Sequence, residues 1–131
     1  MSARLFALTL VLAAVPAAAS AMTYNAISIS PRTGAWGYAY DQPSPYAADR
    51  VAMYNCRTRS NSPGDCRIVM RTHGAYCGAL ALHHTDGDAV GWGTASAPTA
   101  GRARRQALEE CNANQNDDDE CEEVAIVTCS H

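Results

Sequence analysis

The chain has 131 residues, with 13 Asp and Glu against 10 basic residues that are all Arg, and its formal charge at pH 7 is −3. This length favours a single domain. The mild acidity argues against a nucleic-acid-binding protein, which carries a basic surplus.

The first residues have the layout of a secretory signal peptide. Arg4 is followed by an apolar run from Leu5 to Val15, and Ala19-Ser20-Ala21 forms an A-x-A cleavage site. The apolar run is too short to favour a permanent membrane span. We therefore expect a signal peptide over residues 1–21, cleavage after Ala21, and a mature domain over residues 22–131. This domain is expected in the periplasm or outside the cell, without stable membrane insertion.

The mature chain opens with two predicted strands and a helix. Ile27 and Ile29 alternate with serine in the first strand, and a turn at residues 30–34 leads to a second strand of alternating aromatic and small residues. Ser44 and Pro45 are typical of a helix start. The helix presents Ala48, Ala52 and Cys56 on one face, and residues 66–72 read as a third strand.

The second half repeats this order. Residues 77–83 predict a strand, "HTDGD" a turn, and Val90 and Trp92 the start of another strand. Thr99 is the expected N-cap of a second helix. That helix presents Ala103, Ala107 and Cys111 on one face, and Val124, Ile126 and Thr128 mark the last strand.

Fixed spacings show that the two halves are copies. Trp36 precedes Cys56 by 20 residues and Trp92 precedes Cys111 by 19, while 10 residues separate each of these Cys from the next one. Such repetition defines two units, 24–76 and 77–131. The sequence therefore predicts an α+β domain, in which a duplicated β-β-α-β unit forms an antiparallel sheet with two helices.

Six Cys in an exported chain predict a disulfide framework. Zinc is disfavoured, because no pair has C-x-x-C spacing and the compartment is oxidising. Equivalent positions of the repeat should form equivalent bonds, and the two remaining Cys should then pair. The predicted disulfides are Cys56–Cys66, Cys111–Cys121 and Cys77–Cys129.

The mature chain resembles a secreted bacterial family filed as domain of unknown function 4189. The resemblance rests on the stretch from "YNAISIS" to "VAMYNC", on "DCRIVM", "CGALAL" and "GWG", and on the closing "VAIVTCS". It implies an exported, Cys-containing fold and supplies no catalytic residues. The resemblance covers essentially the whole mature chain, but the His83-His84 pair and the acidic run are not features of the family and read as local elaborations.

The turn "HHTDGD" carries the strongest candidate for chemistry. His83, His84, Asp86 and Asp88 suggest a metal or acid–base site. Adjacent residues of a strand point to opposite faces, however, so both His cannot face one ion. Asp86-Gly87 is also a hairpin-turn signal, and the sequence favours a polar turn.

A run of acidic side chains is a second candidate for a functional site. The run Asp117, Asp118, Asp119 and Glu120, with two further Glu after Cys121, reads as a solvated loop or as a docking patch for a basic partner. It lacks the ligand spacing of a calcium loop. Arg102, Arg104 and Arg105 read as a solvated helix face, where Arg105 and Glu109 are spaced for an i,i+4 pair.

Trp36, Tyr38 and Tyr40 share one strand face. We expect this face to pack under the helices as core, because it alternates beside an Ala-rich helix. The alternative is an exposed aromatic binding strip. Gly37 and Gly93, next to the Trp residues, indicate a bulge or a close backbone approach.

The sequence contains no G-x-S-x-G, S-x-x-K or H-E-x-x-H motif, and the disulfides leave no free thiol, so the sequence leans against an enzyme without deciding the question, and we expect no cofactor. The favoured hypothesis is an exported binding module with a protein partner and no nucleic acid. A periplasmic inhibitor or immunity protein and a secreted effector are two of its forms. The alternatives are a small hydrolase that uses the His83/His84/Asp86/Asp88 turn and a structural envelope component.

Overall fold

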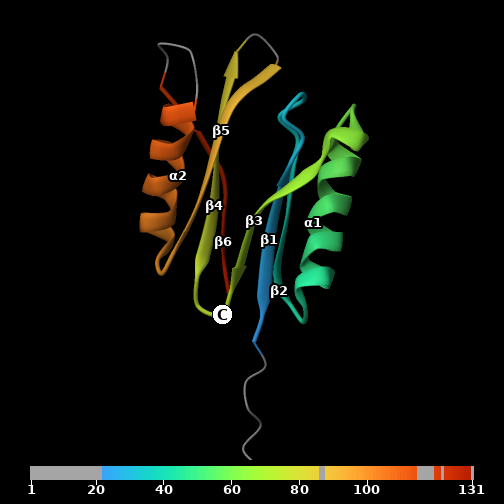
Figure 1. Cartoon of the computed structure of the whole chain (residues 1–131), viewed down its shortest axis with the longest axis vertical. Helices are drawn as coiled ribbons and strands as arrows, with labels where there is room; N and C mark the ends of the chain where they lie inside the picture. Colours follow the sequence, from blue (N-terminus) through green and yellow to red (C-terminus); the bar gives the residue numbers. More distant parts are fainter. Residues whose placement is uncertain (1–21, 86–87, 115–119, 122, 131) are drawn as a thin grey trace, which may run out of the picture.

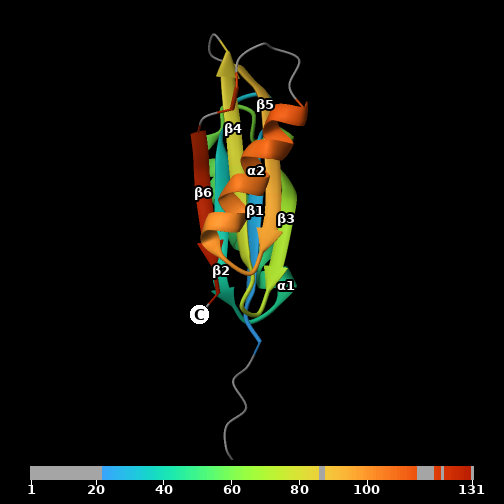
Figure 2. The ribbon, with the colours of Figure 1, turned by 90° about the vertical axis from the view of Figure 1, so that its left-hand side faces the viewer.

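The computed structural model of the protein describes residues 22–85, 88–114, 120–121 and 123–130. In these residues, six strands form two three-stranded antiparallel sheets, which lie face to face between two helices (Figures 1 and 2). The first unit contains β1 (Tyr24–Ile29), β2 (Trp36–Gln42), α1 (Pro45–Arg59), a short 3-10 helix (Pro63–Asp65) and β3 (Arg67–His73). The second unit contains β4 (Cys77–Thr85), β5 (Asp88–Ala97), α2 (Ala100–Asn114) and β6 (Glu123–Cys129).

The predicted duplication of a β-β-α-β unit is confirmed, and each unit builds its own sheet. The strand orders are β2-β1-β3 and β5-β4-β6, so the first strand of each unit is central and its last strand returns beside it. The central strands β1 and β4 run in the same direction (Figure 1). The antiparallel strands that the sequence predicts are thus divided between two sheets.

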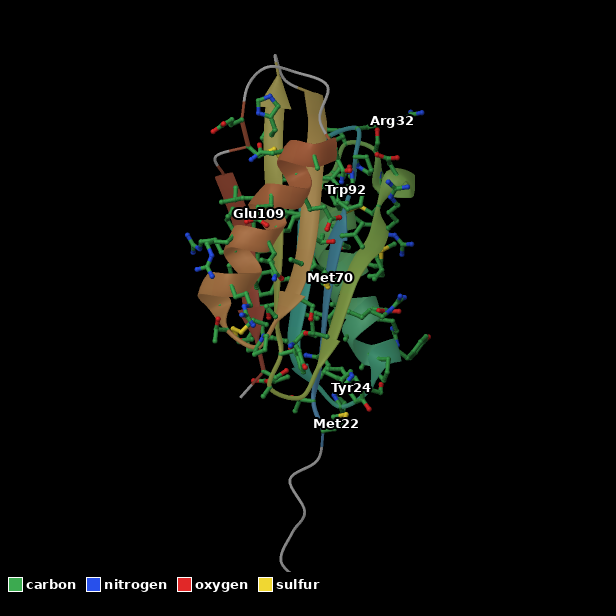
Figure 3. All side chains as sticks on the ribbon, turned by 60° about the vertical axis from the view of Figure 1, so that its left-hand side comes forward. Met22, Tyr24, Arg32, Met70, Trp92 and Glu109 are labelled. Atoms are coloured by element: carbon green, nitrogen blue, oxygen red, sulfur yellow. A yellow bond between two sulfur atoms is a disulfide. The ribbon has the colours of Figure 1, made fainter. Side chains whose placement is uncertain are left out.

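The two sheets pack through the large apolar residues of their central strands. Ile27 and Ile29 of β1 and Leu80 and Leu82 of β4 form one cluster and are at most 1% exposed. Figure 3 shows Met70 and Trp92, which pack against this cluster from the neighbouring strands. Each central strand is therefore buried on both faces, with its bulky residues toward the other sheet.

The layer between each helix and its sheet is built from small residues. Ala48, Ala52 and Cys56 of α1 are fully buried, and Ala103, Ala107 and Cys111 of α2 repeat the pattern. A Cβ added to Gly37 would overlap the Ala52 carbonyl oxygen and the Cys56 amide nitrogen. The same addition at Gly93 would overlap the backbone of Ala107 and Cys111. The expected close approach is confirmed, and what approaches is the helix backbone.

Both helices begin where the sequence predicts. The Ser44 hydroxyl accepts a hydrogen bond of 3.1 Å from the Ala47 amide, and the Thr99 hydroxyl accepts one of 3.3 Å from the Arg102 amide. These bonds satisfy amides that the first helical turn leaves without a backbone partner. The surface pair expected between Arg105 and Glu109, both in the described part of α2, does not form an ion pair.

All three predicted disulfides are present. Cys56–Cys66 and Cys111–Cys121 each join the end of a helix to the strand that follows, across a sequence separation of 10 residues. Cys77–Cys129 joins the neighbouring strands β4 and β6 across 52 residues. Each closed loop is expected to add about 2–4 kcal/mol of stability, which a core of mostly small residues needs.

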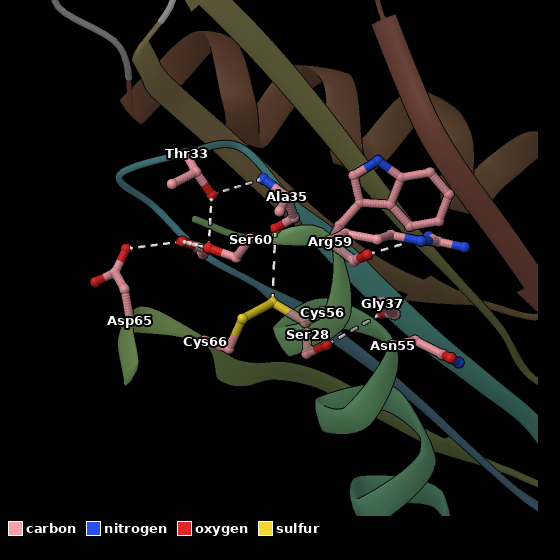
Figure 4. Close-up of a disulfide and its surroundings, with 12 residues drawn as sticks. Ser28, Thr33, Ala35, Gly37, Asn55, Cys56, Arg59, Ser60, Asp65 and Cys66 are labelled. Atoms are coloured by element: carbon pink, nitrogen blue, oxygen red, sulfur yellow. Dashed lines mark hydrogen bonds between the residues drawn. A yellow bond between two sulfur atoms is a disulfide. The ribbon is translucent and has the colours of Figure 1, made fainter. Parts of the chain in front are cut away.

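A hydrogen-bond network holds the loops beside the Cys56–Cys66 disulfide (Figure 4). The Asp65 carboxylate accepts from the Arg32 amide at 2.7 Å and from the Ser30 hydroxyl at 3.0 Å. The Ser60 hydroxyl in turn donates to Ser30. The Arg32 amide, followed by the Ser30 hydroxyl, holds the pKa of Asp65 below its ordinary value of 3.8.

Replacing either close-approach glycine should separate a helix from its sheet. Gly37→Ala and Gly93→Ala are each expected to lower the free energy of unfolding by about 1–3 kcal/mol, measured by urea denaturation. Gly101→Ala is the matched control, because a Cβ there meets nothing within 4 Å and alanine favours the helix. Equal stability of all three variants would contradict the close-packing account.

The lowered pKa of Asp65 predicts how its contribution depends on pH. The folded state binds this proton less tightly than the unfolded state, so the carboxylate stabilises the fold above pH 3.8. Its contribution is lost as the pH falls through the lowered value. Asp65→Asn should therefore be less stable than the wild type at neutral pH, and the difference in stability should shrink as the pH falls below 3.8. Glu109→Gln, on the outer side of α2, should show no such convergence.

Candidate functional site

Few of the residues that the sequence singled out as candidate site residues fall in the described part of the second unit. On β4, His83 is half-buried and His84 is exposed, and Glu120 is exposed after α2. Asp86 and residues 117–119 lie outside the described residues, and for Asp88 the structure describes the backbone in β5 alone. Within the described residues there is no group of three or more His, Cys, Asp or Glu that could hold a metal ion. The site at "HHTDGD" and the acidic docking patch stay predictions.

The aromatic face of β2 points away from its helix, so the expectation that it packs under the helices is wrong. Gly37 and Ala39 face α1, while Trp36 and Tyr38 pack against the cluster between the sheets. Successive ring centroids from Trp36 to Tyr40 lie 6.0 and 6.1 Å apart. Only small residues fit below the closely packed helix, which forces the aromatic residues to the other face. Trp36 and Tyr38 are half-buried core, and Tyr40 is 54% exposed.

The outer face of α1 carries exposed aromatic side chains. Tyr46 is 71% exposed and Tyr54 is 68% exposed, and Arg50 lies between them at the i,i+4 spacing that places three residues on one helical face. The Arg50 guanidinium carbon lies 5.7 Å from the centre of the Tyr46 ring. Among the described residues, the exposed large apolar side chains all lie in the first unit or just before it: Met22, Tyr40, Tyr46, Val51, Tyr54 and Tyr76.

A groove runs beside this face, between α1 and β3. It has a volume of about 720 Å³, and α1 contributes two Tyr and two Arg to its walls while β3 contributes two further Arg. We call it the Arg–Tyr groove. It is lined by Tyr46, Asp49, Arg50, Met53, Tyr54, Arg57, Cys66, Arg67, Ile68 and Arg71.

The groove holds more positive charge than its own carboxylate can neutralise. Arg71 donates to both oxygens of Asp49, at 2.9 Å and 2.7 Å, and these hydrogen bonds raise the pKa of Arg71. The ion pair is exposed and worth about 0–1 kcal/mol, so it orients Arg71 more than it stabilises the fold. Within the described part of the chain, Arg50, Arg57 and Arg67 form no ion pair. The groove can therefore accept an anionic ligand.

The second helix shows which of these features the fold requires. Aligning the buried stripes of the two helices places Gly101 where α1 has Tyr46, Glu109 where it has Tyr54, and Asn112 where it has Arg57. Figure 3 shows Glu109 on the outer side of α2. An equivalent helix thus packs in the same way without exposed tyrosines or Arg57, so the exposed face of α1 is not needed for folding.

The last strands of the two units, β3 and β6, also differ in the residues that line the groove. Ile68 pairs with Ser28 and Val124 with Ala81 at matching places of the two sheets. This correspondence places Glu123 where the first unit has Arg67, and Val127 where it has Arg71. Both arginines that β3 contributes to the groove are therefore specific to the first unit.

Sequence reasoning did not identify this site. The stretch "PYAADRVAMYNC" predicts a buried stripe of small residues, and its opposite face also repeats Tyr and Arg at helical spacing. An alignment of the two helices by their buried alanines shows the signal for this site, because the outer face of the second helix has no aromatic residues at the positions of Tyr46 and Tyr54.

Comparison with known proteins bears on the fold more than on the site. The family described as "Domain of unknown function (DUF4189)" matches residues 24–129, which is nearly the whole described region. No curated protein and no solved structure shows a significant match to the chain.

Proposed function

Because the chain belongs to the DUF4189 family, whose description names no activity, we propose a function from the surface itself: the protein is an exported binding module that holds a protein partner on the outer face of α1. The observation that carries the proposal is the row Tyr46, Arg50 and Tyr54, exposed on α1 and without aromatic counterparts on α2.

The composition of this face supports a protein partner. Tyr and Arg are enriched among the residues that dominate binding energy at interfaces. A tyrosine offers a large contact area with few rotatable bonds, so little entropy is lost when it is held in place. Val51, 37% exposed on the same helix, adds apolar area beside the two rings.

Export is supported by the covalent frame. Six described cysteines form three disulfides, and such bonds persist in the periplasm or outside the cell. The predicted signal peptide over residues 1–21 gives the route. In the described region, no helix has the length and hydropathy needed to span a membrane. An inhibitor of a secreted toxin and an effector that acts on a host are two forms of such a module.

The test is the double variant Tyr46→Ser/Tyr54→Ser. Both side chains are more than two-thirds exposed, so the melting temperature should stay close to that of the wild type. Affinity for the partner recovered from the envelope or culture fluid should fall at least about 30-fold, as expected when one or two anchor residues are lost. Affinity is measured by calorimetry with the purified partner.

The matched control is Gly101→Ser/Glu109→Ser, at the positions of α2 that correspond to Tyr46 and Tyr54. It should bind the partner as the wild type does. If the α1 variant and the control bind the partner equally well, the outer face of α1 is not the interface. Recovery of no saturable partner would favour a structural envelope component.

A further inference from the structure

We propose that the Arg–Tyr groove binds an acidic, extended peptide segment of the partner, which adds as a strand to the free edge of β3. This inference rests on the proposed function and names the chemistry of the partner. Three features of the first unit support it: an open sheet edge, a bulge in that edge, and arginines on both sides of it.

The edge is open because β3 is the last strand of its sheet. In the strand order β2-β1-β3, the described part of β3 pairs with β1 alone. The backbone N–H and C=O groups on its other side are free to pair with an added strand, which is a common mode of peptide recognition. Polysaccharides and nucleic acids lack the peptide backbone that this pairing needs.

A bulge determines where the arginines of this edge point. Along β1 the neighbours Ile27 and Ser28 pair with Met70 and Ile68, so Val69 is an extra residue on β3. Without the bulge, residues four apart would share one face. With it, the two arginines lie on opposite faces of the strand.

The contacts of these arginines agree with that arrangement. Arg71 reaches Asp49 on the side of α1, whereas the Arg67 guanidinium carbon lies 5.6 Å from the ring centre of Trp92 in the other sheet. The arginines therefore flank the edge of β3 from both sides. A strand added there points its successive side chains to alternate faces and can present a carboxylate to each.

Charge favours an acidic segment over a neutral one. The groove has four Arg and one Asp, and Arg57 on α1 faces the same space as Arg67 and Arg71. At the corresponding positions of β6 the sequence has Glu123 and Val127, so both arginines of the β3 edge are missing there. The first unit alone should therefore take the ligand.

The spacing of the acidic residues gives the sharpest test. Two carboxylates that meet arginines on opposite faces must be an odd number of residues apart in the added strand. We would compare two fluorescein-labelled Thr/Val heptapeptides, one with Glu residues three apart and one with Glu residues four apart. The first should bind the full chain about tenfold tighter in fluorescence anisotropy at low salt, and its affinity should fall as salt rises.

Variants locate the binding. Arg57→Gln/Arg67→Gln leaves the Arg71–Asp49 pair intact and should weaken binding of the odd-spaced peptide at least about tenfold. Arg104→Gln/Arg105→Gln on α2 removes the same charge and should bind as the wild type does. Backbone amide signals of β3 should shift in NMR spectra when the odd-spaced peptide is added.

Three results would overturn the inference. These are absence of binding of both peptides at low salt, equal affinity for the two spacings, and equal weakening by the α2 control. Binding of inorganic phosphate or heparin in the groove without the peptide would also overturn it. If Tyr46→Ser/Tyr54→Ser loses the natural partner while Arg57→Gln/Arg67→Gln keeps it, the proposed function stands and the acidic-peptide inference fails.

Discussion

The direct contact between each helix backbone and a glycine of its sheet is the constraint on which the rest of the structure depends. Gly37 and Gly93 leave no side chain between strand and helix, so only alanines and a cysteine fit on the buried stripe of each helix. The short distance brings each helix-end cysteine within reach of the next strand. It also directs the bulky residues of the strands to the opposite face, where they join the two sheets.

Because the unit is duplicated, the molecule contains its own comparison. Features present in both units are the close-approach glycine, the Ala-Ala-Cys stripe, the helix-end disulfide and the bulge in the last strand. These are requirements of the fold. The exposed tyrosines of α1 and the arginines of β3 occur in the first unit alone. Large exposed aromatic side chains cost solubility and are not needed for folding here, which makes binding the simplest reason for their presence.

Much of the fold could be predicted from the sequence, because periodicity and cysteine spacing report local and covalent structure. The order of elements, the helix caps and the three disulfides follow from such signals. Alternation along "WGYAY" showed that Trp36, Tyr38 and Tyr40 share a face of the strand. It could not show whether this face packs against the helix or against the other sheet. Only the tight fit of Gly37 against α1 decides this. The sequence predicted one antiparallel sheet, whereas the six described strands are divided between two sheets, because this division depends on contacts between the units.

The candidate binding site was harder to predict, because its residues lie on the surface and its arginines are placed by a bulge in β3. Nothing in "CRIVMRT" marks Val69 as an extra residue, yet this bulge separates Arg67 from Arg71. The net charge of −3 also conceals an asymmetry: residues 24–76 contain six Arg and three Asp, whereas residues 77–131 contain three Arg and ten Asp and Glu. The two units thus have the same backbone fold, but their net charges have opposite signs. In the proposed binding mode, an acidic ligand is attracted to the edge of β3 and finds neither arginine at the matching edge of β6, so charge would distinguish two otherwise similar edges.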